Sequence, residues 1–252
     1  MKTAYYKEYS RHLNREMEFK VYGHGGKPCL VFPSQDGRFF DYENNGMIEA
    51  AKEYIDAGKI QFFCVDSIDK ETWSDEYGDA RHRIELHERY YNYIIEELVP
   101  RIFEINKNDQ GYYAQGLMTT GNSMGAAHCV NFFLRRPDIF NICLALSGIY
   151  DAGYFFKGYM DELVYRNSPL DYLKNLPANH PYIEKYNQSR IVLCCGQGDW
   201  EHDMVKSTHQ MQYLFEKMGV HAWFDYWGYD VAHDWCWWRR QLPYFLNFLL
   251  DC

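Results

Sequence analysis

Short continuous runs of apolar residues recur along this chain, separated by longer segments in which apolar residues have helical spacing. Such runs are typical of strands covered on both faces, as in a parallel sheet. The strand candidates, several of which are such continuous runs, are EFKVYG (18–23), CLVFP (29–33), IQFFCVD (60–66), GLMTTG (116–121), ICLALSG (142–148), IVLCCG (191–196) and AWFDYW (222–227). The helical segments lie near 44–57, 79–106, 124–136, 203–219 and 234–250. The alternation predicts an α/β fold with a mostly parallel central sheet flanked by helices on both faces.

The chain contains no repeat, low-complexity tract or Pro/Gly-rich linker that would divide it. We therefore predict one domain that spans residues 1–252. Residues 150–188 interrupt the alternation, because they are rich in Tyr, Asn and Pro. We interpret them as an insertion over the end of the sheet that would carry an active site, where they could contact a substrate.

Charge and cysteine usage exclude several functional classes. A formal charge of −9 and the lack of a basic run argue against nucleic acid as a partner, since that binding depends on Lys and Arg contacts to phosphate. Most of the eight cysteines stand in apolar runs and no C-x-x-C pair occurs, which indicates reduced, buried thiols rather than disulfides or a zinc site. The sequence contains neither a secretory signal nor an apolar stretch of membrane-spanning length. We expect a cytoplasmic protein with no membrane contact, no metal and no cofactor.

The segment TTGNSMGAAHC (119–129) contains the pattern G-x-S-x-G at residues 121–125. A predicted strand precedes it, and Gly125 and two alanines open the predicted helix that follows. This context is that of a nucleophile elbow, a tight turn that exposes a serine hydroxyl at the carboxyl edge of a sheet. We predict Ser123 as the nucleophile. The alternative is an ordinary strand-to-helix turn in which Ser123 is only the N-cap.

A serine nucleophile requires a general base and an acid that orients the base. His233 lies in the loop between the last predicted strand and the final helix, where this fold class places its base. The acid should follow the penultimate strand, in the segment GQGDWEHD (196–203). We predict Asp199 for this role, with Glu201 and Asp203 as competitors, and we expect Asp203 to cap the next helix.

An oxyanion hole requires two backbone N–H donors. We predict Met124, directly after the nucleophile, as one donor. The second should come from SQDGRFF (34–40), with Gln35 as the best candidate and its two neighbours close behind, although this segment also reads as an ordinary turn. Trp200 and Trp235 flank the predicted acid and base. They are candidates for substrate binding, with packing in the core as the open alternative.

Together these segments resemble the putative esterase family of α/β-hydrolases, which includes esterase D, feruloyl esterases and mycolyltransferases. The most specific pieces are the elbow followed by RRPDIF and the pattern H-D-W-x-x-W-R-x-x-L that begins at His233. The resemblance implies an α/β-hydrolase fold in which Ser123, Asp199 and His233 form the triad. The chain departs from the family at Ala232, where glycine is common, and in the oxyanion segment, which lacks the family's His-Gly pair.

The resemblance implies a serine carboxylic-ester hydrolase that works through an acyl-enzyme. We expect its substrate to be a small-molecule ester, aromatic or sugar-linked. Two alternatives stay open, namely an acyltransferase that uses the same triad and a catalytically silent binding protein on a hydrolase scaffold. Aromatic residues make up 18% of the chain, which also leaves a homo-oligomer open.

Overall fold

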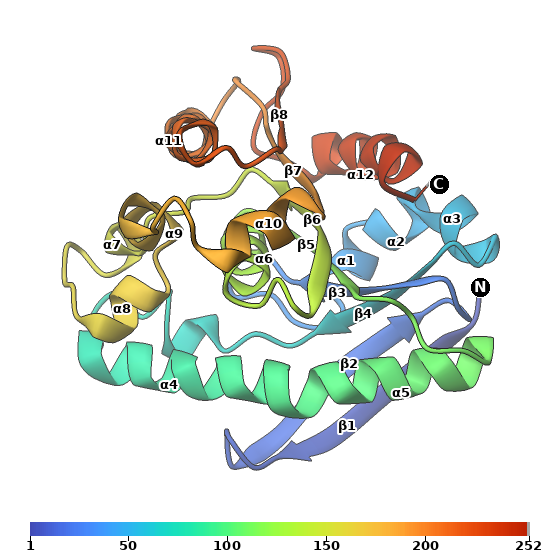
Figure 1. The fold of residues 1–252 in the computed structure, drawn as a ribbon. Coiled ribbons are helices and arrows are strands. Elements are labelled where there is room, and N and C mark those ends of the chain that lie inside the picture. The colour runs from blue at the N-terminus through green and yellow to red at the C-terminus, as the bar shows by residue number, and fades with distance from the viewer. Residues whose placement is uncertain (251–252) are drawn as a thin grey trace.

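The computed structural model describes residues 1–250, and within them one sheet of eight strands forms the centre of the molecule (Figure 1). The strand order is β1-β2-β4-β3-β5-β6-β7-β8; the strands from β3 to β8 pair in parallel, and β1 and β2 are antiparallel. The strands are β1 (Thr3–Ser10), β2 (Arg15–Tyr22), β3 (Lys27–Phe32), β4 (Ile60–Val65), β5 (Leu117–Asn122), β6 (Phe140–Leu146), β7 (Arg190–Cys195) and β8 (Trp223–Tyr226). The predicted α/β fold with a mostly parallel sheet is confirmed.

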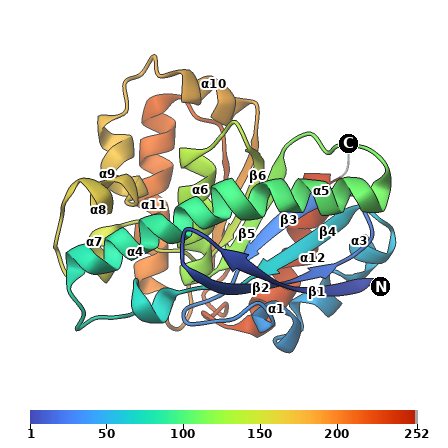
Figure 2. The ribbon, with the colours of Figure 1, turned by 90° about the horizontal axis from the view of Figure 1, so that it is seen from below.

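Helices cover both faces of the sheet, and each face has its own apolar core (Figures 1 and 2). One core packs the sheet against α4 (Ala80–Asn92), α5 (Val99–Gln110), α6 (Met124–Arg135) and α11 (His202–Met218). The other core packs it against α1 (Asp41–Asn44), α2 (Met47–Ala50), α3 (Lys52–Asp56) and α12 (Trp235–Leu250). Strands buried on both faces are the reason that the apolar runs are continuous.

Two elements differ from the sequence-based expectation. Strand β1 was not predicted, because its residues alternate between exposed and partly buried and it forms the edge of the sheet, where Tyr5 and Tyr9 face solvent. The helix predicted at 44–57 is broken into short pieces. Gly46 adopts the left-handed conformation (φ 75°) between α1 and α2, and a turn at Ala51 separates α2 from α3.

The long helical segment predicted at 79–106 forms α4 and α5, joined by a π-helical turn, η2 (Tyr93–Leu98) (Figure 2). Pro100 is the second residue of α5, two positions after the end of this turn. Proline cannot donate the hydrogen bond of a regular helix and its ring crowds the preceding turn, so wider winding before Pro100 accommodates the ring without ending the helix.

Residues 150–188 contain only short helices: α7 (Ala152–Phe155), α8 (Glu162–Arg166), α9 (Pro169–Tyr172), a 3₁₀ turn η3 (Leu173–Asn175) and α10 (Pro181–Asn187). They lie between β6 and β7 in the chain and pack beside α6 and α11 (Figures 1 and 2). Among residues 1–250, no helix has both the length and the apolar composition needed to cross a membrane.

Candidate active site

Ser123 occupies a strained turn between β5 and α6. Its φ of 55° and ψ of −124° are rarely adopted by residues other than glycine, and its N–H donates to Leu146 O at 2.9 Å. Two glycines permit this turn. A Cβ on Gly121 would lie 2.3 Å from Gly125 O, and one on Gly125 would lie 2.5 Å from Phe32 O. The glycines of the G-x-S-x-G pattern are therefore required by backbone packing around the serine.

We expect Gly125→Ala to lower the free energy of unfolding by about 3 kcal/mol, because the added methyl group meets backbone that cannot rotate away. Gly111→Ala is the matched control. A methyl group there meets no atom within 4 Å, so only the strain of its positive φ remains, about 1 kcal/mol. Urea denaturation of both variants measures the difference. Equal stability of the two variants would show that the close approach at Gly125 is not a constraint.

His233 is brought to Ser123 from the other end of the chain. It lies in the loop between β8 and α12, and its Nε2 atom is 2.9 Å from Ser123 Oγ. Its backbone N–H donates to Asp199 O at 2.9 Å. Its ring packs nearly perpendicular to the Trp238 ring, at a centroid distance of 4.8 Å. These contacts fix both the main chain and the ring of the histidine. Ser123 and His233 thus have the hydrogen-bonding distance of a nucleophile and its base.

The carboxylate beside His233 belongs to Glu201. Glu201 Oε1 lies 3.5 Å from His233 Nδ1, slightly longer than a good hydrogen bond, and the side chain is buried. Ser147 Oγ donates to the same oxygen at 2.5 Å, and Trp238 Nε1 donates to Ser147 Oγ at 3.2 Å. A chain of hydrogen bonds therefore holds the carboxylate against the inner side of the imidazole.

This arrangement differs from the sequence-based prediction of Asp199 as the acid. The Asp199 side chain is exposed and makes no ion pair with His233 in the described structure; only its backbone carbonyl contacts that residue. The loop runs farther than expected after β7, because Gly198 N–H pairs with Val231 O at 2.9 Å. Trp200 then reverses the chain with a φ of 66°, which leaves Asp199 outside and Glu201 inside.

Asp203, the other competitor, was expected to cap α11. It lies within the first turn of that helix instead, and the N-cap position is occupied by Glu201 without a side-chain capping bond. The side chain of Glu201 is thus directed to the site rather than to the helix end.

A small cavity of about 90 Å³ adjoins Ser123. Gln35 and Met124 both line it, at the positions predicted for the oxyanion donors. The amide of Ser34 is already donated to Asp41 Oδ2 at 3.0 Å, so Ser34 is less suited to that role. The other lining residues are Ser147, Ile149, Tyr154, Phe155 and Met204.

The two tryptophans predicted to bind substrate do not line this cavity. Trp200 is 86% exposed, and Trp235 packs edge-to-face against Tyr42 and Trp238 on the face of the sheet that α12 covers. Tyr154 and Phe155 occupy the cavity wall instead. They belong to the aromatic stretch of the 150–188 segment, so composition pointed to the right segment but not to these residues.

A buried polar cluster behind Met124 was not predicted from the sequence. His128 Nε2 and Asp69 Oδ1 are 2.9 Å apart, and Trp73 Nε1 donates to His87 Nδ1 at 2.9 Å. Burial and the neighbouring His128 hold the pKa of His87 well below its usual value, which keeps its ring neutral and able to accept this bond. Because His128 follows Met124 by about one helical turn, the cluster ties the loop around Trp73 to the start of α6.

Comparison with known proteins identifies the family and the fold. The family described as Putative esterase matches residues 10–249. A ferulic acid esterase structure aligns with a TM-score of 0.75 at 17% identity, over 99% of this chain and 97% of that chain. S-formylglutathione hydrolase of Staphylococcus aureus gives 0.68 at 17% identity, over 99% and 97% of the two chains. Fluorophosphonate-binding serine hydrolase F of the same organism gives 0.71 at 16% identity, over 100% and 99%. A search of curated proteins gives no match. The structural likeness establishes the α/β-hydrolase fold.

Proposed function

The chain belongs to the Putative esterase family, and we propose that it is a serine hydrolase that cleaves a small carboxylic ester through an acyl-enzyme. The observation that carries this proposal is the distance of 2.9 Å between Ser123 Oγ and His233 Nε2, at a strained turn that opens into a cavity.

In the proposed reaction, His233 Nε2 accepts the proton of Ser123 Oγ as that oxygen attacks the ester carbonyl. The backbone N–H groups of Met124 and Gln35 then hold the negative oxygen of the tetrahedral intermediate. His233 returns the proton to the departing alcohol, and an acyl group stays bound to Ser123. A water molecule, deprotonated by His233, attacks this acyl group and releases it as a carboxylic acid, and His233 returns the proton to Ser123 Oγ.

We propose Glu201, in place of Asp199, as the acid that orients His233. Its carboxylate faces Nδ1 and would stabilise the imidazolium that forms when Nε2 takes the serine proton. Catalytic hydrogen bonds are often long in ligand-free structures and shorten when substrate binds, so the 3.5 Å separation is compatible with this role. Ser147 and Trp238 act through Glu201, because they hold its carboxylate in place.

The small cavity favours a short acyl group. A volume of about 90 Å³ accommodates only a few carbon atoms, and Phe155 forms part of the wall. We infer that any aromatic or sugar part of the substrate belongs to the alcohol, outside this cavity. Tyr154 and Phe155 replace Trp200 and Trp235 as the proposed contacts to substrate.

We expect Phe155→Ala to raise the ratio of kcat/KM for a hexanoyl ester over an acetyl ester about tenfold, because the lost ring opens space for added methylene groups. The ratio is independent of the fraction of folded enzyme. Trp200→Ala serves as control and should leave the ratio unchanged, since that side chain is exposed. An unchanged ratio in Phe155→Ala would mean that the acyl group binds elsewhere.

The proposal as a whole is tested with p-nitrophenyl acetate and a fluorophosphonate probe. Hydrolysis together with labelling supports a serine hydrolase, and absence of both supports the silent binding protein. Adding an acceptor alcohol separates hydrolysis from acyl transfer, because a transferase would form a new ester at the expense of the free acid.

We also propose a reducing compartment such as the cytoplasm. The seven cysteines of the described chain are free thiols, and six of them are buried. Cys129 and Cys143 lie with their sulfur atoms 3.5 Å apart without a disulfide, as expected of thiols kept reduced.

A further inference from the structure

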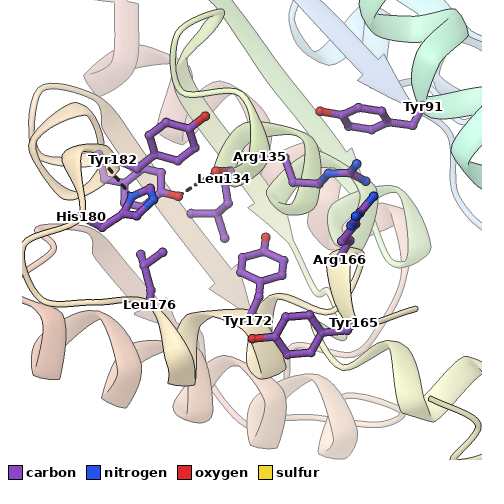
Figure 3. A pocket seen from close by; sticks show the side chains of 10 residues that line it. Tyr91, Leu134, Arg135, Tyr165, Arg166, Tyr172, Leu176, His180 and Tyr182 are labelled. Carbon is purple, nitrogen blue, oxygen red and sulfur yellow. Dashed lines mark hydrogen bonds between the residues drawn. The ribbon is translucent and has the colours of Figure 1, made fainter. Parts of the chain in front are cut away.

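A second cavity, of about 370 Å³, lies away from Ser123, between α4, the C-terminal end of α6 and the segment that carries α8 to α10 (Figure 3). It shares no lining residue with the cavity beside Ser123. Five tyrosine rings line it, from Tyr91, Tyr165, Tyr172, Tyr182 and Tyr186, together with the imidazole ring of His180. The proposed esterase reaction does not use this cavity.

Hydrogen bonds hold several of these rings by their hydroxyl groups. Tyr186 donates to Leu134 O at 2.7 Å, Tyr172 donates to Asn131 Oδ1 at 3.3 Å, and the Tyr165 hydroxyl accepts from Asn175 at 3.1 Å. Three of the five hydroxyl groups are thereby engaged, and much of the cavity wall is ring carbon and leucine side chain. His180 also lines the cavity, and its Nδ1 accepts from the Tyr182 N–H at 3.2 Å. Such a lining accommodates a flat apolar group better than a polyhydroxylated one, which would need many polar partners.

Positive charge stands at one side of the cavity, where Figure 3 shows the side chains of Arg135 and Arg166. The charge of Arg135 is neutralised by Glu88, because the guanidinium donates to both carboxylate oxygens at 2.8 and 3.2 Å. Its Cζ atom also lies 3.5 Å from the centroid of the Tyr91 ring. Arg166, the last residue of α8, is exposed, and its side chain makes no hydrogen bond or ion pair within residues 1–250. One uncompensated cation therefore borders an aromatic hollow.

We propose that this cavity binds a small planar aromatic monocarboxylate, with its ring among the tyrosines and its carboxylate on Arg166. A guanidinium binds a carboxylate through two parallel hydrogen bonds, and a single free arginine matches a single negative charge. A phosphate dianion would find only one uncompensated partner. The proposal is independent of the esterase reaction, since it involves none of the residues proposed for that reaction.

The test is isothermal titration calorimetry of the wild-type protein with cinnamate. We expect saturable binding with a Kd on the order of 0.1–1 mM, which suits a ligand of about a dozen heavy atoms. Cinnamamide, which lacks the charge, and 3-cyclohexylpropanoate, which lacks the flat ring, should each bind about tenfold more weakly. No saturable heat up to about 10 mM cinnamate, or equal binding of cinnamamide, would overturn the proposal.

Variants locate the binding site. Arg166→Gln should weaken cinnamate binding about tenfold, while Arg89→Gln, an equal charge change at another exposed arginine outside the cavity, should leave it unchanged. Both variants should keep the ester hydrolysis and the denaturation midpoint of the wild type. If Arg166→Gln binds cinnamate normally and Phe155→Ala does not, the ligand occupies the cavity beside Ser123 and the second site is refuted.

Discussion

Ser123→Ala is expected to lower kcat/KM for p-nitrophenyl acetate by about 10⁴- to 10⁶-fold, the loss typical of removing a serine nucleophile. The hydroxyl is the only group at this turn that can form the acyl-enzyme, and His233 Nε2 at 2.9 Å would have no proton to accept. The variant should also lose labelling by the fluorophosphonate probe. Its stability should rise slightly or stay unchanged, because the backbone turn depends on the flanking glycines rather than on the hydroxyl.

Ser147→Ala is the matched control for this prediction. Ser147 is a second serine that lines the same cavity and also has a positive φ, of 60°. Its hydroxyl donates to Glu201 rather than to His233, so the imidazole is not placed to take its proton. We expect labelling to persist in Ser147→Ala and kcat to fall about tenfold, through looser positioning of Glu201. If labelling persisted in Ser123→Ala and disappeared in Ser147→Ala, Ser147 rather than Ser123 would be the nucleophile.

The fold could be predicted largely because parallel strands buried on both faces leave a strong signal. A run such as IVLCCG has no polar face to place in solvent, which indicates burial on both faces. The structure contains a strand at each predicted segment. Strand β1 gives no such signal, since one face of an edge strand is solvated and residues such as Tyr5 alternate with polar ones. Breaks within a helical segment are also hard to predict from sequence. Gly46 permits a left-handed turn but does not require one, and the surrounding packing selects that conformation.

The site was predictable to the extent that it depends on chain order. Ser123 directly follows β5, and His233 is the one histidine in the loop between β8 and α12, so chain order alone selects both residues. The acid lies at the end of a loop whose path is set by long-range contacts, such as the bond between Gly198 N–H and Val231 O. Counting residues from the strand therefore selected Asp199, although Glu201 is the buried carboxylate. The cavity wall was missed for the same reason, since Phe155 reaches it through the packing of α7.

Glu201→Gln should lower kcat by about 10³- to 10⁴-fold, with little change in KM. Glutamine has the same shape, so Ser147 can still donate to its oxygen and the fold should persist. The amide carries no charge to stabilise a protonated His233, and its NH₂ group would favour the wrong tautomer of the imidazole. KM should change little because Glu201 does not line the cavity. Glu201→Asp, which keeps the charge but shortens the side chain, should recover part of the lost rate.

Asp199→Asn is the comparison that decides between the two acids. Its exposed side chain contacts neither His233 nor the cavity, and the carbonyl that accepts from His233 N–H is unchanged by the substitution. We expect kcat to stay within about threefold of the wild type, as for other exposed substitutions. Steady-state kinetics of both variants on one ester gives the answer directly.

A large loss of kcat in Asp199→Asn with an active Glu201→Gln would mean that the loop after β7 rearranges during turnover to bring Asp199 to the histidine. The buried hydrogen-bond chain from Trp238 through Ser147 to Glu201 argues against that rearrangement, because moving Glu201 away would leave buried polar groups without partners.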